Sequence, residues 1–264
     1  MHNWRPDKYE KSSLAQQLWA EELLSKIDIA GSERVLDIGC GDGRITAKIA
    51  ELVPDGSVLG IDSSAAMVAF AVERHPQEEH PNLSFQMGDA RTLDFDGEFE
   101  IVVSFAALHW VSDHVPVLRG IRDALRPGGR AFLTFGGRGN AAVPLQIADD
   151  LIAEDRWRRS FEGFDFRYAF FGPEEYRIWI EEAGLDPKRV ELIPKDMVQP
   201  GAQDFAGWIE STWLPYLERV PEDRRREFIS EVVGRYLRLH PPDGEGKVHV
   251  GMVRLEAVAE RPGI

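Results

Sequence analysis

An apolar strand that runs directly into three alternating glycines constrains this chain more than any other feature. Residues 35–44 read VLDIGCGDGR, with glycine at positions 39, 41 and 43. Glycine has no Cβ, so a ligand can approach the backbone closely and the turn can adopt positive φ without strain. The amide groups that open the following helix add a partial positive field. The pattern therefore predicts a strand, a tight turn and a helix start that hold a nucleotide-like cofactor.

The spacing of the glycines argues against two other kinds of nucleotide loop. A dinucleotide-binding loop has the pattern G-x-G-x-x-G, but Arg44 stands where its third glycine belongs. A phosphate-binding P-loop needs a Lys and then Ser or Thr after its last glycine, and this chain has neither there. An NAD-linked oxidoreductase is thus disfavoured. The alternative that the glycines only form a sharp turn stays open at this point.

Composition predicts one elaborated globular domain of 264 residues, of which 43% are hydrophobic. Asp and Glu number 45 against 31 Lys and Arg, a formal net charge of −14 that repels nucleic acids and anionic membranes. The single cysteine, Cys40, excludes an intrachain disulfide, and no His, Cys, Asp or Glu group has convincing metal-ligand spacing. No secretory signal or membrane-spanning stretch is recognised, so we expect a cytoplasmic protein. We also expect a monomer or a homodimer.

Strand and helix patterns alternate along the first half of the chain, as in a doubly wound sheet. Helices are expected at 45–52, 64–74 and 115–125. Strands are expected at 34–38, 57–61, 83–87, 99–105, 130–135, 188–193 and 248–259. The fold class is therefore α/β, with a seven-stranded, mostly parallel sheet whose last strand pairs antiparallel.

Helical patterns also interrupt this alternation. Residues 140–182 are mainly helical in pattern and rich in Phe, and 204–239 have helical periodicity in two segments separated near Val220 and Pro221. We interpret the chain as a single domain, residues 1–264, with a cofactor-binding core at 30–136. Segments 137–182 and 200–240 are predicted to form a helical cap over the substrate site.

Acidic residues follow the next two strands after the glycine turn. Asp62 directly follows the second strand, near the offset at which doubly wound folds place an acid against ribose hydroxyls. Asp89 follows the third strand, on the same edge of the sheet, where a carboxylate can accept from the adenine amine. An Asp after a strand is also a common helix N-cap or turn residue. Together with Asp37, these acids support a site for an adenosine-containing ligand.

Four motifs together resemble the class I methyltransferases that use S-adenosylmethionine: residues 35–43, the GIDSS sequence at 60–64, GDA at 88–90 and LRPGG at 125–129. The resemblance implies that the cofactor becomes S-adenosylhomocysteine, and that its methionine portion lies on the glycine turn. The cofactor-binding residues that it implies are Asp37, Gly39, Cys40, Gly41, Asp62, Ser63, Met67, Asp89, Ala90 and Phe105, with Tyr9 folding over the cofactor. Met67 has a core position in its helix as the alternative.

A closer resemblance is to the trans-aconitate methyltransferase family. It depends on WRPDKY at 4–9, ALHWVSDH at 107–114 and VRLEAVAER at 253–261. That family has Gln where this chain has His109. The resemblance implies a small-molecule acceptor and O-methylation of a carboxylate.

His109 and Trp110 are the predicted catalytic residues, because they follow the fourth strand, where this fold places its acceptor. Methyl transfer is an in-line displacement, so the protein's main task is to align the reacting atoms and exclude water. A carboxylate acceptor is already ionised, whereas a phenol, an amine or a carbon acid would gain from a base such as histidine. A surface packing pair is the alternative for these two residues.

Three arginines and a tryptophan are the candidate substrate-binding residues. Guanidinium groups bind carboxylates by paired hydrogen bonds, and the tryptophan is a candidate for an apolar lid over the site. The alternatives are a solvated helix face for the arginines and an ordinary aromatic core for the tryptophan. Other functions left open are C- or N-methylation of an apolar metabolite and a non-catalytic cofactor-binding protein. The four residues are Arg138, Arg158, Arg159 and Trp208.

Overall fold

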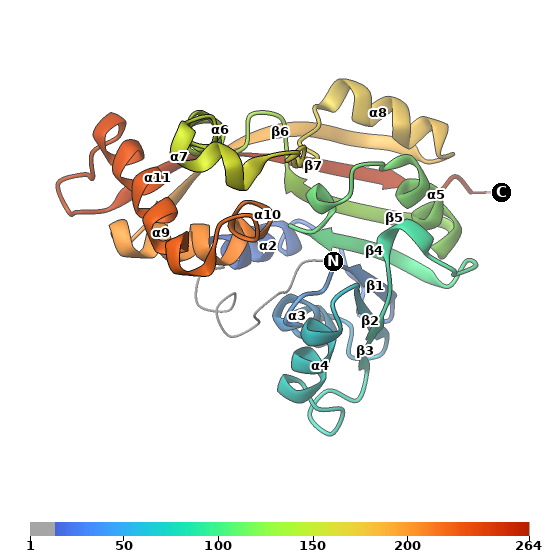
Figure 1. Ribbon diagram of the computed structural model, residues 1–264. Coiled ribbons are helices and arrows are strands. Elements are labelled where there is room, and N and C mark those ends of the chain that lie inside the picture. Colours follow the sequence, from blue (N-terminus) through green and yellow to red (C-terminus); the bar gives the residue numbers. More distant parts are fainter. Residues whose placement is uncertain (1–13, 264) are drawn as a thin grey trace. The chain divides into compact units, whose positions relative to one another are not determined.

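The computed structural model describes residues 14–263 and contains a seven-stranded sheet with the strand order β3-β2-β1-β4-β5-β7-β6 (Figure 1). Its first five strands are parallel where they pair, and β7 pairs antiparallel with β5. The strands are β1 (Arg34–Ile38), β2 (Ser57–Asp62), β3 (Leu83–Met87), β4 (Phe99–Phe105), β5 (Leu125–Gly136), β6 (Asp186–Gln199) and β7 (Val248–Glu260). The predicted fold class and its antiparallel last strand are confirmed.

The described helices connect these strands, and six of them lie after β5. They are α2 (Leu14–Leu24), α3 (Arg44–Leu52), α4 (Ala65–Arg74), α5 (Val115–Ala124), α6 (Ala142–Ile152), α7 (Asp155–Arg158), α8 (Pro173–Glu182), α9 (Ala202–Thr212), α10 (Leu214–Leu217) and α11 (Arg225–Leu239). Short 3-10 turns are η1 (Ala90–Thr92), η2 (Leu108–Trp110), η3 (Arg159–Phe161) and η4 (Glu222–Arg224). Among the described residues, none of these helices has the length and apolar character to span a membrane.

Side-chain alternation along β1 explains why both faces of the sheet are covered. Leu36 and Ile38 belong to a buried cluster that also contains residues of α5 and α8, whereas Val35 belongs to a second cluster with residues of α2 and α3. Successive side chains of a strand point to opposite faces, so a strand buried on both sides reads as a continuous apolar run. Because β2 and β4 flank β1 on opposite sides, the direction of winding changes at the carboxyl end of β1, which is the usual ligand position in such sheets.

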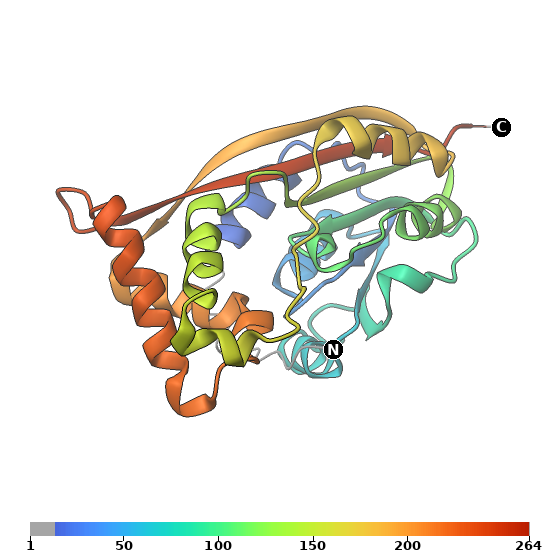
Figure 2. The same cartoon turned by 45° about the horizontal axis from the view of Figure 1, so that its top comes forward.

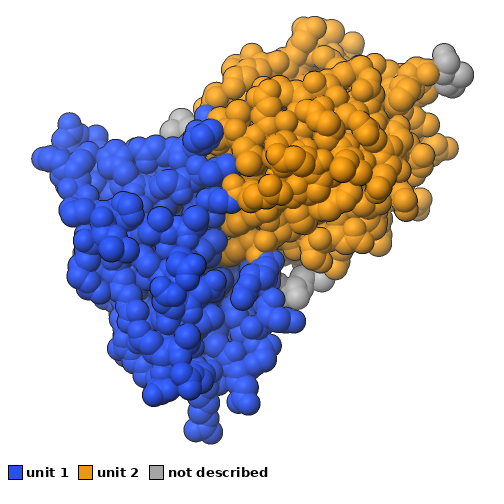
Figure 3. Space-filling model, turned by 90° about the horizontal axis from the view of Figure 1, so that it is seen from above, with its two compact units in different colours: residues 1–15, 139–167, 194–253 blue, residues 16–138, 168–193, 254–264 orange. Residues whose placement is uncertain are grey.

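The chain divides into two compact units (Figure 3). Unit 2 comprises residues 16–138, 168–193 and 254–264, and it contains the glycine turn and most of the sheet. Unit 1 comprises residues 1–15, 139–167 and 194–253. The division falls within β6 and β7, the two long strands that run side by side in Figure 2.

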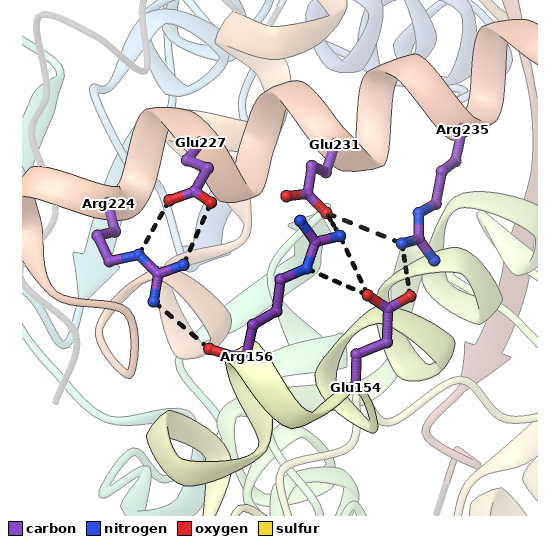
Figure 4. A network of polar contacts seen from close by, with 6 residues as sticks. All are labelled: Glu154, Arg156, Arg224, Glu227, Glu231 and Arg235. Carbon is purple, nitrogen blue, oxygen red and sulfur yellow. Dashed lines mark hydrogen bonds and ion pairs between the residues drawn. The ribbon is translucent and has the colours of Figure 1, made fainter.

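Unit 1 has an aromatic core and an ionic network on its helices. Phe205, Trp208 and Tyr216 are buried in it. Arg156 pairs with Glu154 and with Glu231, so α7 is joined to α11 (Figure 4). The remaining contacts of the network are made by Arg235 with Glu154 and Glu231, and by Arg224 with Glu227 and the backbone oxygen of Arg156.

Within 140–182, helices are interrupted by short turns at 140–141 and 153–154 and by residues 162–172, which form neither helix nor strand. Aromatic side chains recur there at every second position, 164, 166, 168 and 170. A period of two is typical of extended backbone and not of a helix. The predicted strand 188–193 is also longer than expected, because β6 spans Asp186–Gln199.

Candidate active site

The three glycines form the predicted turn between β1 and α3. Gly39, Gly41 and Gly43 have φ values of +77°, +56° and +81°, in the left-handed region that favours glycine. The amides of Gly39 and Cys40 both donate to the carbonyl oxygen of Ile61, at 2.8 and 3.0 Å. The turn is therefore fixed to the carboxyl end of β2, and Gly43 caps α3.

Two of these glycines are needed for close packing, and the third faces open space. A Cβ on Gly39 would lie 2.2 Å from the Cβ of Ala107, and one on Gly43 would lie 2.7 Å from Cζ of Phe85. A Cβ on Gly41 would have no heavy atom of the described chain within 4 Å beyond its own neighbours. A ligand can therefore approach the backbone at Gly41, while Gly39 lets the segment after β4 pack directly on the turn.

Asp37 and Asp62 place two carboxyl groups beside this turn. Asp37 is only 2% exposed and accepts a hydrogen bond of 2.7 Å from the Thr46 hydroxyl. Burial raises the pKa of Asp37 to about 7, opposed by the Thr46 hydrogen bond and assisted by the nearby Asp62. The sequence did not single out Thr46, which pairs with Asp37 across the start of α3.

Asp62 is held by the backbone on both sides of its strand end. Its carboxylate accepts from the amides of Gly41 at 3.1 Å and Ser64 at 2.8 Å. Burial raises the pKa of Asp62, and these two hydrogen bonds oppose that shift. A carboxylate has about four lone-pair sites, so Asp62 keeps acceptor capacity for further donors such as ribose hydroxyls.

Asp89 is the N-cap of the short helix η1, the role that the sequence allowed as the alternative to binding adenine. Its side chain accepts from the amide of Arg91 at 2.9 Å and caps η1, and the Arg91 guanidinium contacts both of its oxygens. The hydrogen bond from that guanidinium is the main reason why the pKa of Asp89 is lowered. Its contact with adenine stays a prediction.

The other predicted cofactor residues lie around these strand ends. Met67 is 3% exposed and its amide donates to the N-capping hydroxyl of Ser64, so it is a core residue of α4. Ser63 is exposed, whereas Ala90 and Phe105 are partly buried. Tyr9 lies outside the described residues. The cofactor contacts of these residues stay predictions.

Cys40 is buried in the turn, 8% exposed. Burial and the nearby Asp37 and Asp62 raise its pKa, so the thiolate is disfavoured. We expect a thiol reagent to label the native protein at least about a hundredfold more slowly than the urea-unfolded chain. Cys40 is the only cysteine, so a colorimetric thiol assay reports on this site alone. Labelling of native protein at the unfolded rate would contradict the described packing.

The segment after β4 brings His109 and Trp110 to the same edge of unit 2. It begins at Ala106, a non-glycine residue with φ of +53°, and continues into η2. Such backbone conformations carry strain and occur often at functional sites. Since Ala107 packs on Gly39, this segment adjoins the glycine turn.

His109 lies among aromatic rings. Its ring centroid is 5.4 Å from that of Trp110, 6.1 Å from Tyr168 and 6.0 Å from Phe170. The amide of Gly136 points at Nδ1 from 3.5 Å. Burial, with a smaller contribution from His114, lowers the pKa of His109 to about 3, so the imidazole is neutral at physiological pH. The sequence did not predict the contacts of His109 with Tyr168 and Phe170, although the period-two aromatics at 164–170 carry a signal of extended backbone there.

Two of the predicted substrate-binding arginines pair with acidic side chains of the protein. Arg138 in unit 2 pairs with both oxygens of Glu175 at 2.7 Å and with Glu174. In unit 1, Arg158 pairs with Asp155, and Arg159 is exposed. Trp208 is buried and stacks on Phe205, and its Nε1 has no hydrogen-bond partner among the described residues. Their roles toward a substrate stay predictions.

Comparison with known proteins agrees with this geometry. The methyltransferase domain family matches residues 35–129. The trans-aconitate 2-methyltransferase of Deinococcus radiodurans is 32% identical over 98% of both chains, and that of Mycobacterium tuberculosis strain H37Ra is 28% identical over 98% of this chain and 97% of its own. The fold is also that of a Bacillus halodurans protein of known crystal structure, with a TM-score of 0.64 at 16% identity over 92% of this chain and 98% of that one. The chain therefore belongs to the S-adenosylmethionine-dependent methyltransferases, in the family that includes the trans-aconitate 2-methyltransferases.

Proposed function

We propose that this enzyme methylates a carboxylate oxygen of a small-molecule acceptor placed beside His109 and Trp110. The observation that carries the proposal is the direct packing of Ala107 on Gly39, because it joins the segment with these two residues to the cofactor turn. The similarity to trans-aconitate 2-methyltransferases over nearly the whole chain supports a carboxylate acceptor.

The residues at the turn fit S-adenosylmethionine. The open space at Gly41 admits a ligand against the backbone, and the free acceptor capacity of Asp62 suits ribose hydroxyls. Asp37, when ionised, supplies negative charge for the cofactor's ammonium group. When bound, S-adenosylmethionine supplies an electrophilic methyl group on a positively charged sulfur.

The chain's own residues then have to orient the acceptor and exclude water. A carboxylate is its own nucleophile, so no base is required. A neutral His109 can hydrogen-bond the acceptor without adding charge. The rings of Trp110, Tyr168 and Phe170 give the surroundings of His109 an apolar surface. Such a surface excludes water, and polar contacts with the acceptor are stronger without water.

An apolar acceptor, methylated on carbon or nitrogen, is the second candidate. The observation that favours it is the aromatic surrounding of His109, together with the pairing of Arg138 with Glu175. A rate comparison separates the two candidates: purified enzyme and labelled S-adenosylmethionine are incubated with trans-aconitate or with uncharged aromatic amines and phenols. Faster labelling of trans-aconitate supports the carboxylate proposal, and labelling of the uncharged compounds alone overturns it.

Asp62→Ala should weaken S-adenosylmethionine binding by about 1–3 kcal/mol, the scale for losing charged hydrogen bonds. Titration calorimetry measures the change. Asp62→Asn is the matched control, because its amide oxygen still accepts from one of the two backbone amides, and it should lose less. An unchanged affinity in the alanine variant would refute the ribose assignment.

A further inference from the structure

We infer that the buried His114, oriented by Tyr176, is a positioning residue that sets the conformation of the η2 turn bearing His109 and Trp110. The inference rests on the proposed function, in which this turn receives the acceptor. His114 is only 1% exposed and bonds the backbone on both sides of the turn, so the role assigned to it acts through the turn.

The hydrogen bonds of His114 fix its tautomer. Nε2 lies 3.0 Å from the carbonyl oxygen of Leu108 and 3.0 Å from that of Val111. Both partners can only accept, so Nε2 carries the proton and donates to them. Nδ1 is then the acceptor for the hydroxyl of Tyr176, at 3.2 Å. Each nitrogen of this buried ring therefore has one assigned role, which satisfies it.

The two carbonyls that His114 binds bracket the turn. Leu108 is its first residue, and Val111 directly follows its last, so one N–H group holds both ends of η2. The turn's own backbone bonds are the amide of Trp110 to Ala107 and that of Val111 to Leu108. Ala106, just before the turn, has a strained φ of +53°. Strained backbone persists only where its surroundings over-determine it, and His114 provides such a constraint.

The packing around His114 leaves its ring no other place. His114 is 1% exposed and Tyr176 is fully buried. The ring centroid of His114 lies 5.1 Å from that of Phe135 on β5 and 4.9 Å from that of Phe171. Removal of its N–H would leave two carbonyls in this apolar surrounding without their shared donor, so the turn would be expected to rearrange.

The same residues also place the aromatic rings beside His109. Tyr176 belongs to α8, which starts directly after the extended segment 168–172. That segment is fixed to the turn by the amide of Ala169, which donates to the carbonyl of His109 at 3.0 Å. At its other end the amide of Gly172 donates to Glu175 of α8 at 2.8 Å. His114 therefore connects the η2 turn with the helix that anchors the opposing aromatic segment.

The test compares His114→Leu, His114→Gln and Tyr176→Phe with Val58→Ala, a buried control in β2 that belongs to the other core cluster, which contains neither Leu108 nor Tyr176. Three quantities are measured on the full chain: the Kd for S-adenosylmethionine, amide hydrogen exchange at Trp110 and Val111, and transfer of labelled methyl to the low-molecular-weight fraction of a cell extract. The exchange measurement needs no knowledge of the acceptor.

His114→Leu should lower methyl transfer by roughly 30- to 100-fold with a Kd within about twofold of wild type, and should speed exchange at both amides. His114→Gln, which keeps an N–H donor, should recover part of the loss. Tyr176→Phe, which keeps the ring, should lower transfer by about fivefold. Val58→Ala should lose thermal stability but neither transfer nor exchange protection at the turn.

The inference is overturned if His114→Leu and Tyr176→Phe keep wild-type transfer and exchange, or if their losses only follow thermal stability as in the control. Failure of the proposed function gives a different result: His109→Ala and Trp110→Ala would transfer methyl at the wild-type rate while cofactor binding is intact. Hydrogen exchange in the His114 variants then still decides whether this residue holds the turn.

Discussion

Gly39→Ala should abolish measurable S-adenosylmethionine binding, a loss of at least about 100-fold, and destabilise the fold by about 2–5 kcal/mol. Two physical effects add at this position. The φ of +77° is unfavourable for an L side chain, and the new Cβ would lie 2.2 Å from the Cβ of Ala107, so the turn or the segment after β4 must move. Calorimetry and urea unfolding measure the two losses.

Gly41→Ala is the matched control in the same turn. Its φ of +56° brings a conformational cost of about 1–2 kcal/mol, but its Cβ meets no other described residue within 4 Å. We expect a clearly smaller loss of stability than for Gly39→Ala, together with weaker cofactor binding because the methyl group occupies the space open to the ligand. Equal stability of the two variants would contradict the packing of Ala107 on Gly39.

The free energy of unfolding should depend on pH through Asp37. Its native pKa of about 7 lies above the ordinary value of 3.8, so between these values the native state retains a proton that the unfolded chain releases. The unfolded state then binds fewer protons, and the Asp37 contribution lowers stability as pH rises from about 4 to 7. The full effect is at most about 4 kcal/mol.

Asp37→Asn isolates this contribution, because asparagine keeps the shape and does not titrate. His109 and His114 have pKa values lowered to about 3 and about 4, and they give the opposite slope below about pH 6.5. The difference between wild type and Asp37→Asn removes both histidines from the comparison. Urea unfolding from pH 5 to 8 should show the variant gaining stability over wild type as pH rises, and parallel curves would contradict a buried, proton-binding Asp37.

The sequence predicted the parts of the fold that local patterns determine. Strands at 34–38, 83–87 and 99–105 were located to the residue, since each is an apolar or alternating run ended by a turn. The glycine turn was predicted for the same reason, because positive φ restricts the residue type. The length of β6 was underestimated. Pro194 and the charged residues around it are not typical of a strand, and β6 continues past them beside β7, a strand distant in the sequence.

The side-chain partners in the site depend on long-range contacts and could not be read from the chain in that way. Arg138 was a candidate for binding a substrate carboxylate, and its pairing with Glu175, which lies 37 residues further along the chain, could not be foreseen. His114 and Tyr176 are 62 residues apart, so their contact could not be read from the local sequence around either residue. The position of His109 after β4 was predictable from the order of strands, but its neutral state was not, because burial decides it.

The chemical bond formed in the product tests the proposed function most directly. Wild-type enzyme is incubated with S-adenosylmethionine that carries a deuterated methyl group and with the low-molecular-weight fraction of a cell extract, and labelled products are analysed by mass spectrometry before and after mild alkaline hydrolysis. The proposed function predicts one labelled methyl per S-adenosylhomocysteine formed, in a small carboxylic acid from which alkali removes it as methanol. Label that resists alkali on carbon or nitrogen, or bound cofactor with no transfer to any small molecule, would contradict it.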